Sequence, residues 1–176
     1  GNLPYAEFLE IKPPLSFVLF APAAIGGRLS LFPMHVIGIF VTVATGLLVG
    51  RAVATWTKDP IAARVAPWLY VLATLCDVPA INGELLLNLP TAAALFCIAI
   101  GQGGLLRYDL LAGIAIGLAS MCKHQGGMPL AAFGCVFFAQ AICARSFGPI
   151  GRAFALVVGF SVPWLVAASI YLGAGR

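Results

Sequence analysis

Apolar residues form long stretches in this chain, separated by short polar connections. Six such stretches cover residues 29–53, 61–80, 85–101, 105–122, 128–144 and 153–175. Their lengths lie near the ~20 residues that an α-helix needs to cross the hydrocarbon layer of a bilayer. The strict alternation of apolar and polar positions that marks a membrane β-strand is absent. The pattern therefore predicts an all-α, polytopic bundle of about six transmembrane helices.

A shorter apolar stretch, residues 15–27, precedes the first span and contains Pro22. It is too short for a full crossing, so we expect an interfacial or re-entrant segment. The polar residues 1–14 come before it. We therefore interpret residues 1–28 as an outer juxtamembrane segment of a single transmembrane domain that covers residues 1–176.

The overall composition agrees with a membrane protein and excludes a soluble domain. Apolar residues make up 61% of the chain and charged residues only 9%, against about 25% charged residues in an average soluble domain. The mean hydropathy is +1.03. The chain begins with Gly1 and shows no signal-peptide pattern, so we expect it to be a fragment of a longer protein.

Basic residues predict which side of the bundle faces the cytoplasm. Six of the ten Lys and Arg residues flank three alternate connections between spans, namely Arg51, Lys58, Arg64, Arg107, Arg145 and Arg152. The positive-inside rule places such connections in the cytoplasm. We therefore predict a multi-pass protein of the plasma membrane, in a bacterium the inner membrane.

The opposite, outer side gathers a different set of polar residues. It receives Glu7, Glu10, Lys12, Asp77, Asn82, Glu84, Lys123, His124 and Gln125. His35 is the only ionisable residue that we expect well inside a span. The candidate chemistry therefore lies at the outer interface and not near the midplane, where ion-coupled transporters usually place their charges.

Lys12 stands directly before two prolines, Pro13 and Pro14. Prolines keep the preceding backbone out of a helix, so this lysine is held by stiff backbone at the outer interface. A lysine in such a place is a suitable point charge for a phosphate group. The alternative is a lysine that only extends to the membrane surface ahead of an apolar segment.

Glu84 and Lys123 lie at the ends of spans on the same outer side. An acid in the first helical turn is stabilised by the helix dipole, and this alone could explain Glu84. Together with Asp77 it could instead bind a divalent cation or orient a hydroxyl nucleophile. Lys123 could face the same site as Lys12, or belong to a solvated turn between helices.

Two pairs of glycines at a spacing of four, Gly46 and Gly50 and then Gly113 and Gly117, place small residues on one helix face. Such faces predict close packing between helices and not a ligand site. The five cysteines include no CxxC pair. We interpret them as small apolar residues and predict no metal site from them.

The order of these features resembles the amino-terminal half of the membrane glycosyltransferases that use polyprenyl-phosphate sugars and have the GT-C fold. The resemblance is carried by Lys12-Pro13-Pro14-Leu15, by Arg28-Leu29 at the start of a span, by Glu84, and by the glycine-rich run that ends at Lys123. The family includes the protein O-mannosyltransferases. It also includes bacterial enzymes that move aminoarabinose or other sugars onto lipid A and cell-envelope glycans.

The resemblance implies a hexosyl- or mannosyltransferase acting on the periplasmic or extracellular face. The donor would be a polyprenyl-phosphate sugar and the acceptor a hydroxyl group of a glycan, lipid or protein. Lys12 and Lys123 would contact the donor phosphate, while Glu84, Asp77 and Glu10 would line the site. A divalent cation, Mg²⁺ or Mn²⁺, is the implied cofactor. In the family the catalytic base precedes Lys-Pro-Pro, so we expect it upstream of Gly1 and this fragment to be inactive alone.

Two other functions fit the same pattern of spans. The first is a transporter or flippase for a small or lipid-linked solute, which the prolines Pro90 and Pro163 favour because they interrupt spans. The second is a non-catalytic subunit that packs through its glycine faces.

Overall fold

The computed structural model describes residues 12–27, 31–75 and 82–173. These residues are almost entirely helical and contain no strand, which confirms the all-α prediction. The elements in chain order are α1 (Pro14–Phe20), η1 (Ala21–Gly27), α2 (Phe32–Thr57), α3 (Pro60–Thr74), α4 (Gly83–Ile100), η2 (Gly101–Gly103), α5 (Leu106–Cys122), η3 (His124–Gly127), α6 (Met128–Ala144) and α7 (Gly148–Gly173).

Four helical segments of the described chain are long and apolar enough to cross a membrane. They are Phe32–Thr57, Gly83–Gly103, His124–Ala144 and Gly148–Gly173. Helices α3 and α5 cover the other two predicted spans but have only 15 and 17 residues. The structure thus supports a multi-pass membrane protein, while the count of six spans is not confirmed. Residues 76–80, the predicted end of the second span, lie outside the described residues.

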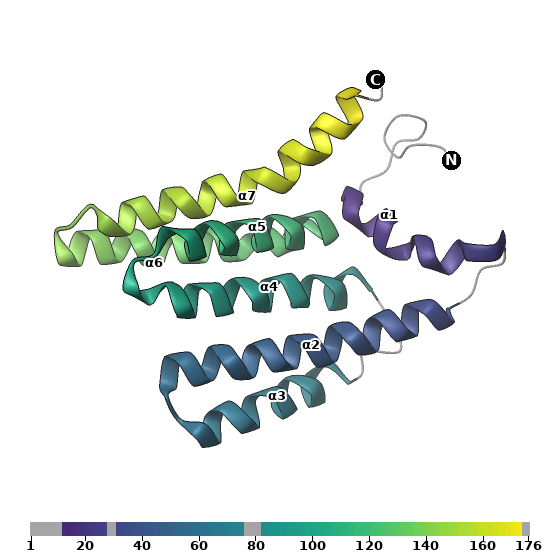
Figure 1. Cartoon of the computed structure of the whole chain (residues 1–176), viewed down its shortest axis with the longest axis horizontal. Helices are drawn as coiled ribbons and strands as arrows, with labels where there is room; N and C mark the ends of the chain where they lie inside the picture. Colours follow the sequence, from purple (N-terminus) through teal and green to yellow (C-terminus); the bar gives the residue numbers. More distant parts are fainter. Residues whose placement is uncertain (1–11, 28–30, 76–81, 174–176) are drawn as a thin grey trace.

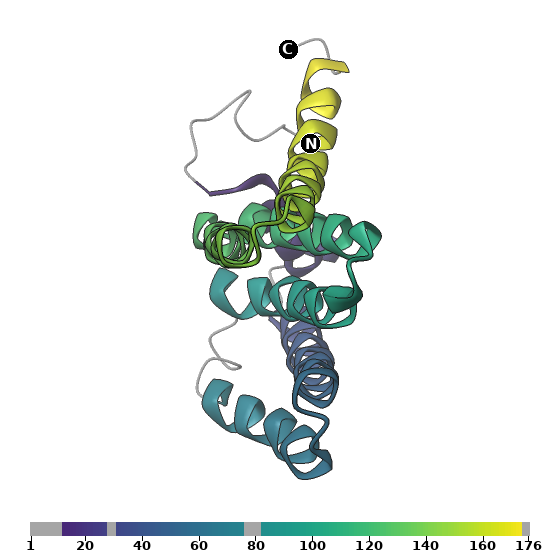
Figure 2. The same cartoon turned by 90° about the vertical axis from the view of Figure 1, so that its left-hand side faces the viewer.

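The long helices lie side by side in a layered bundle. Going across it, α3 packs on α2, α2 on α4, α4 on α5, and α5 on α7, with α6 against α7 (Figure 1). The view from the end shows the same succession (Figure 2). Consecutive long helices run in opposite directions, so their ends fall into two groups at the two ends of the bundle.

Prolines explain where several helices begin. Pro33, Pro60 and Pro129 stand in the first turn of α2, α3 and α6, where the missing backbone N–H would have no helical partner anyway. Pro90 and Pro163 lie inside α4 and α7, and both helices continue through them. The expectation that these two prolines interrupt spans is therefore wrong.

The glycine pairs mark close helix contacts, as the sequence predicts. A Cβ atom at Gly50 would lie 2.6 Å from Cγ of Pro67 in α3. A Cβ atom at Gly113 would lie 2.1 Å from the carbonyl oxygen of Leu156 in α7, and one at Gly159 would lie 2.1 Å from that of Leu110 in α5. The backbones of α5 and α7 can approach this closely only because these positions carry no side chain.

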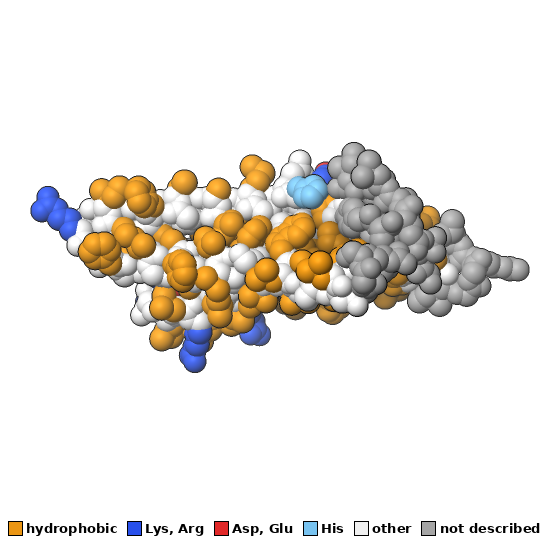
Figure 3. All heavy atoms as spheres, turned by 90° about the horizontal axis from the view of Figure 1, so that it is seen from above, with side chains coloured by type: hydrophobic (Ala, Val, Ile, Leu, Met, Phe, Trp, Pro, Cys, Tyr) orange, Lys and Arg blue, Asp and Glu red, His pale blue; other side chains and the backbone are white. Residues whose placement is uncertain are grey.

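Buried apolar residues, both small and large, form the centre of the bundle. The main cluster joins α4, α5, α6 and α7 through Ala94, Ile98, Ala112, Ile116, Phe137 and Leu156. Large apolar side chains such as Phe40, Trp68 and Phe138 are exposed on the outside. Figure 3 shows hydrophobic side chains over most of one face of the molecule. An outer surface of this kind fits a lipid environment better than water.

The segment of α1 and η1 stays at one end of the bundle and does not run along its length (Figure 1). Leu19 and Phe20 pack against a small buried cluster of Val41, Leu85 and Leu86. This packing fixes the segment at that end of the bundle. It also leaves Lys12 at the same end of the bundle as the start of α4 and the end of α5.

Candidate functional site

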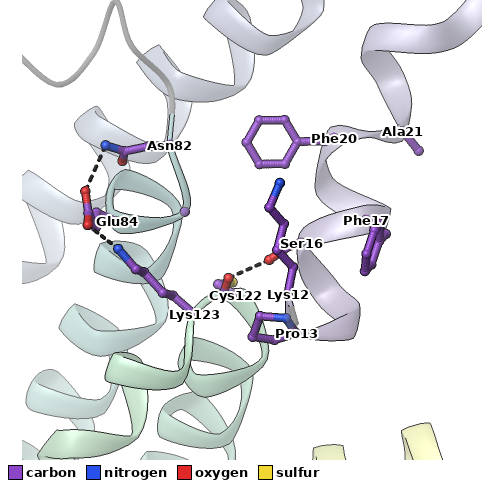
Figure 4. A pocket seen from close by; sticks show the side chains of 11 residues that line it. Lys12, Pro13, Ser16, Phe17, Phe20, Ala21, Asn82, Glu84, Cys122 and Lys123 are labelled. Atoms are coloured by element: carbon purple, nitrogen blue, oxygen red, sulfur yellow. Dashed lines mark hydrogen bonds and ion pairs between the residues drawn. The ribbon is translucent and has the colours of Figure 1, made fainter. Parts of the chain in front are cut away.

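A cavity of about 630 Å³ lies at this end of the bundle, where α1 faces the start of α4 and the end of α5. Its wall contains three residues that the sequence analysis selected, Lys12, Glu84 and Lys123. Figure 4 shows Lys12 reaching in from the side of α1, and Glu84 next to Lys123 on the other side. Pro13, Ser16, Phe17, Phe20, Ala21, Asn82, Gly83 and Cys122 complete the wall.

The two prolines place Lys12 as the sequence predicts. Pro13 is extended, with φ −62° and ψ 152°, and Pro14 opens α1, so Lys12 lies outside the helix. The hydroxyl of Ser16 donates a hydrogen bond of 2.5 Å to the carbonyl oxygen of Cys122. Since Ser16 is buried, this bond fastens α1 to the end of α5 and fixes one wall of the cavity.

Glu84 lies in the first turn of α4 but does not cap the helix. Asn82 does so, because its Oδ1 accepts a hydrogen bond of 2.9 Å from the backbone N–H of Leu85. The Asn82 amide also donates a bond of 2.9 Å to Oε2 of Glu84. The Glu84 carboxylate is thereby oriented by its own helix and presents Oε1 to the neighbouring chain segment.

Lys123 joins α5 to η3 in an extended conformation, with φ −156° and ψ 137°. Its ammonium group forms an ion pair with Oε1 of Glu84. The side chains of Lys123 and Glu84 are 36% and 56% exposed, so the pair faces the cavity and not the packed core. Gly83 permits this approach, since a Cβ there would lie 3.3 Å from the Cys122 carbonyl oxygen.

The described wall carries two ammonium groups and one carboxylate. A lysine ammonium group is a compact point charge that can bind an anion such as phosphate, and Lys123 could do so by exchanging its contact with Glu84. The same residues do not fit a divalent cation, whose ligands would be several oxygen atoms. No group of three or more His, Cys, Asp or Glu side chains suited to a metal occurs among the described residues.

An apolar groove adjoins the cavity. It has a volume of about 800 Å³ and lies between α1, α5 and α7. Phe17 and Ala21 line both the groove and the cavity. The rest of the groove consists of Pro14, Leu15, Val18, Ile114, Leu118, Met121, Val162, Pro163, Val166, Ala167, Ile170 and Tyr171. The polar cavity and the apolar groove thus meet at α1, and the groove extends from there along α5 and α7.

The structure does not bring every predicted site residue to the cavity. Asp77 and Glu10 lie outside the described residues. His124 and Gln125 are exposed in η3 and do not belong to the described wall. Of the predicted site residues that the structure does describe, Lys12, Glu84 and Lys123 come together.

The sequence analysis missed a buried ion pair at the other end of the bundle. Asp109 in α5 is 0% exposed and accepts two hydrogen bonds of 2.9 Å from Nε and Nη2 of Arg152 in α7. Arg152 also lies over the ring of Phe137, 4.4 Å from its centroid. Asp109 is the fourth residue of α5, near the end of that helix and not well inside it. Arg152 is part of α7 and not, as the sequence analysis expected, of a connection.

A signal for this pair was present in the sequence. Asp109 precedes Gly113 by four residues and Gly117 by eight, so the three share the face of α5 that packs on α7. An acid on the small-residue face of an apolar helix needs a cation from the helix that covers it. Arg152 stands near the start of α7, beside the start of α5, where Asp109 lies.

The cavity and the groove are built from parts of the chain that are far apart in sequence. Lys12 comes from the residues before α1, Glu84 from α4, and Lys123 from the junction of α5 and η3.

Comparisons of the chain with protein-family models, with curated proteins and with solved structures found no match in any of the three.

Proposed function

We propose that this chain is part of a membrane glycosyltransferase that moves a sugar from a polyprenyl-phosphate donor to a hydroxyl acceptor on the outer face of the membrane. The observation that carries the proposal is a cavity containing Lys12 and Lys123 that shares two wall residues, Phe17 and Ala21, with an apolar groove between α1, α5 and α7. A ligand that fills both must have an anionic head and a long apolar tail.

The head of the donor matches the cavity. A phosphodiester carries one negative charge, and a lysine ammonium is a compact point charge with three donors for its oxygens. Lys12 and Lys123 approach the cavity from different sides. Such an arrangement would hold a phosphate group between two cations, with the sugar in the remaining space.

The tail of the donor matches the groove. Ile114 and Met121 both line it, and seven residues of α-helix span about 10 Å. A prenyl chain placed there would lie along α5 and α7 and continue into the bilayer. Burying its methylene groups would contribute about 0.8 kcal/mol each, although part of this gain is already available in lipid.

The reaction itself breaks one bond and forms one bond. The bond between the sugar C1 and the donor phosphate oxygen breaks, and its electron pair remains on the phosphate. The acceptor oxygen forms the new bond to C1, while its proton passes to a general base. The products are the glycosylated acceptor and a polyprenyl phosphate. Lys12 and Lys123 would stabilise the charge that develops on the leaving phosphate. No described residue is assigned as the base.

The test is sugar transfer by the complete enzyme in membrane vesicles, with undecaprenyl-phosphate mannose and undecaprenyl-phosphate aminoarabinose as donors. Lys12→Ala and Lys123→Ala should each lower the rate by about tenfold to hundredfold, since a hydrogen bond to a charged group contributes about 1.5–3 kcal/mol. Arg64→Ala is the matched control, because Arg64 is exposed on α3 near the other end of the bundle. Unchanged transfer in both lysine variants would contradict the proposal.

A transporter or flippase for a lipid-linked solute is the second candidate. One observation favours it: within the described part, the buried atoms Thr45 Oγ1 in α2 and Tyr70 Oη in α3 have no hydrogen-bond partner. Thr45 lies midway along α2, where a transporter would keep a polar site. Movement of a lipid-linked solute across vesicles by the complete protein, without any sugar transfer, would favour this function over glycosyl transfer.

A further inference from the structure

We propose that Glu84 determines which phosphate charge this cavity prefers. By binding Lys123, Glu84 disfavours a doubly charged phosphate monoester relative to a singly charged phosphodiester. The inference rests on the proposed function, in which the donor is a phosphodiester and the lipid product is a monoester. Glu84 is then a specificity-determining residue that acts through Lys123.

The contacts of Glu84 hold its charge in the wall. One carboxylate oxygen binds the Lys123 ammonium group, and the other accepts a hydrogen bond of 2.9 Å from the Asn82 amide. Asn82 is itself fixed, because it caps α4 through a second hydrogen bond to the Leu85 N–H. The Glu84 carboxylate therefore stays beside the cavity when an anion takes its place on Lys123.

A phosphate that binds Lys123 must compete with this carboxylate and then remain near it. Glu84 competes with every anion for Lys123. Once an anion has bound, its repulsion from the Glu84 carboxylate grows with the charge of that anion. A phosphate monoester carries close to two negative charges above its second pKa of about 6, and a diester carries one. Glu84 therefore penalises the monoester more than the diester, whatever other charges line the cavity.

This difference has a consequence for turnover. The proposed reaction converts a bound diester into a bound monoester, so the charge of the lipid phosphate rises when the sugar leaves. A fixed carboxylate beside Lys123 weakens binding of the product more than that of the donor. Glu84 thus favours release of the spent lipid carrier and exchange for a new donor molecule.

The experiment measures the dissociation constants of octyl phosphate and methyl octyl phosphate for the purified full-length protein at pH 8. These probes have the same tail and differ in phosphate charge. Glu84→Gln should shift the ratio of the two constants toward the monoester by about fivefold, since a partly exposed ion pair contributes up to about 1 kcal/mol. Lys123→Gln should shift the ratio in the opposite direction, and Lys123→Arg should leave it unchanged.

Asp59→Asn is the matched control for loss of one negative charge. Asp59 caps α3 at the other end of the bundle through a hydrogen bond to the Ile61 N–H, and Asn can keep that cap. An unchanged ratio in Glu84→Gln, or the same shift in Asp59→Asn, would overturn the role of Glu84 while leaving the proposed function intact. If the unmodified protein bound neither probe, the proposed function would be overturned as well.

Discussion

Each end of this bundle contains an ion pair that links two helices, and the two pairs differ in burial and in the number of contacts. Asp109 and Arg152 join α5 to α7 through two parallel hydrogen bonds, with side chains 0% and 13% exposed. Glu84 and Lys123 join α4 to the end of α5 through a single contact, and both face an open cavity. The first pair is enclosed by protein, while the second can exchange its partner.

This difference separates a structural role from a binding role. A buried pair loses its hydration when the helices assemble, so removing one partner leaves a charge that nothing compensates. A partly exposed pair gains little from its attraction, because water screens it and the long side chains lose conformational freedom. The Asp109–Arg152 pair should therefore be needed for assembly, and the Glu84–Lys123 pair for ligand selection.

The largest expected effect is on the buried pair. Arg152→Ala should lower the free energy of unfolding by about 3–5 kcal/mol, because Asp109 would remain buried without a cation. Denaturant unfolding of the purified protein in detergent, followed by circular dichroism, measures this. The double variant Asp109→Asn with Arg152→Gln should recover part of the loss, since both charges are then absent. A cost below about 1 kcal/mol for Arg152→Ala would remove the contrast between the two pairs.

The next effect concerns the backbone contact beside the buried pair. Gly159→Ala should lower the free energy of unfolding by about 1–3 kcal/mol, because its Cβ would meet the Leu110 carbonyl oxygen and force α5 and α7 apart. Gly134→Ala in α6 is the control, since nothing lies within 4 Å of the added atom. That variant should be neutral or slightly more stable. Equal destabilisation by the two substitutions would argue against close packing of α5 on α7.

A smaller effect is expected in the groove beside the exposed pair. Ile114→Ala combined with Val162→Ala, at the end of the groove away from the cavity, should weaken hexadecyl phosphate binding by about tenfold, since contacts worth about 0.8 kcal/mol per methylene are lost. Octyl phosphate should be affected much less, because its shorter tail leaves more of the groove empty. Leu165→Ala is the control, as Leu165 is exposed on α7 and does not line the groove. Equal losses of binding affinity for the two tail lengths would contradict the placement of the lipid tail in the groove.

The smallest expected effect is on the stability of the exposed pair. Lys123→Ala should lower the free energy of unfolding by only about 0.2–1 kcal/mol, although it should sharply reduce binding of the phosphate probes. The same denaturant experiment measures this. A loss of stability as large as that of Arg152→Ala would show that the Glu84–Lys123 pair also serves mainly to hold helices together.

Much of the fold could be predicted from sequence because the membrane imposes a simple pattern. Apolar stretches gave the helices within a few residues, and the predicted range of α6, 128–144, agrees with the structure. The glycine pairs gave the close contacts. The predicted span 105–122 gave α5 within one residue, whereas the second span was expected to run on past Thr74, where α3 ends. Helix continuity through Pro90 and Pro163 also depends on surrounding helices that satisfy the backbone.

Part of the candidate site could also be predicted from the sequence. Residue type and position at the ends of spans selected Lys12, Glu84 and Lys123, and alternation of the spans placed them on one side. The pairing of Glu84 with Lys123 and the cap by Asn82 depend on side-chain distances, which spacing along the chain does not contain. The meeting of the cavity and the groove at Phe17 and Ala21 depends on where α1 lies. No hydrophobic pattern fixes that position.

The most direct test of the central claim is photo-crosslinking of the purified protein with two hexadecyl phosphates, one carrying a diazirine beside the phosphate and the other at the end of the tail. The account predicts that the first labels residues around the cavity, namely 12–21, 82–84 and 122–123. The second should label α5 and α7 along the groove, and hexadecanol with the same diazirine should not concentrate at the cavity. Labels spread evenly over the exposed apolar faces of α3 and α6 would contradict the claim that this end of the bundle binds a lipid phosphate.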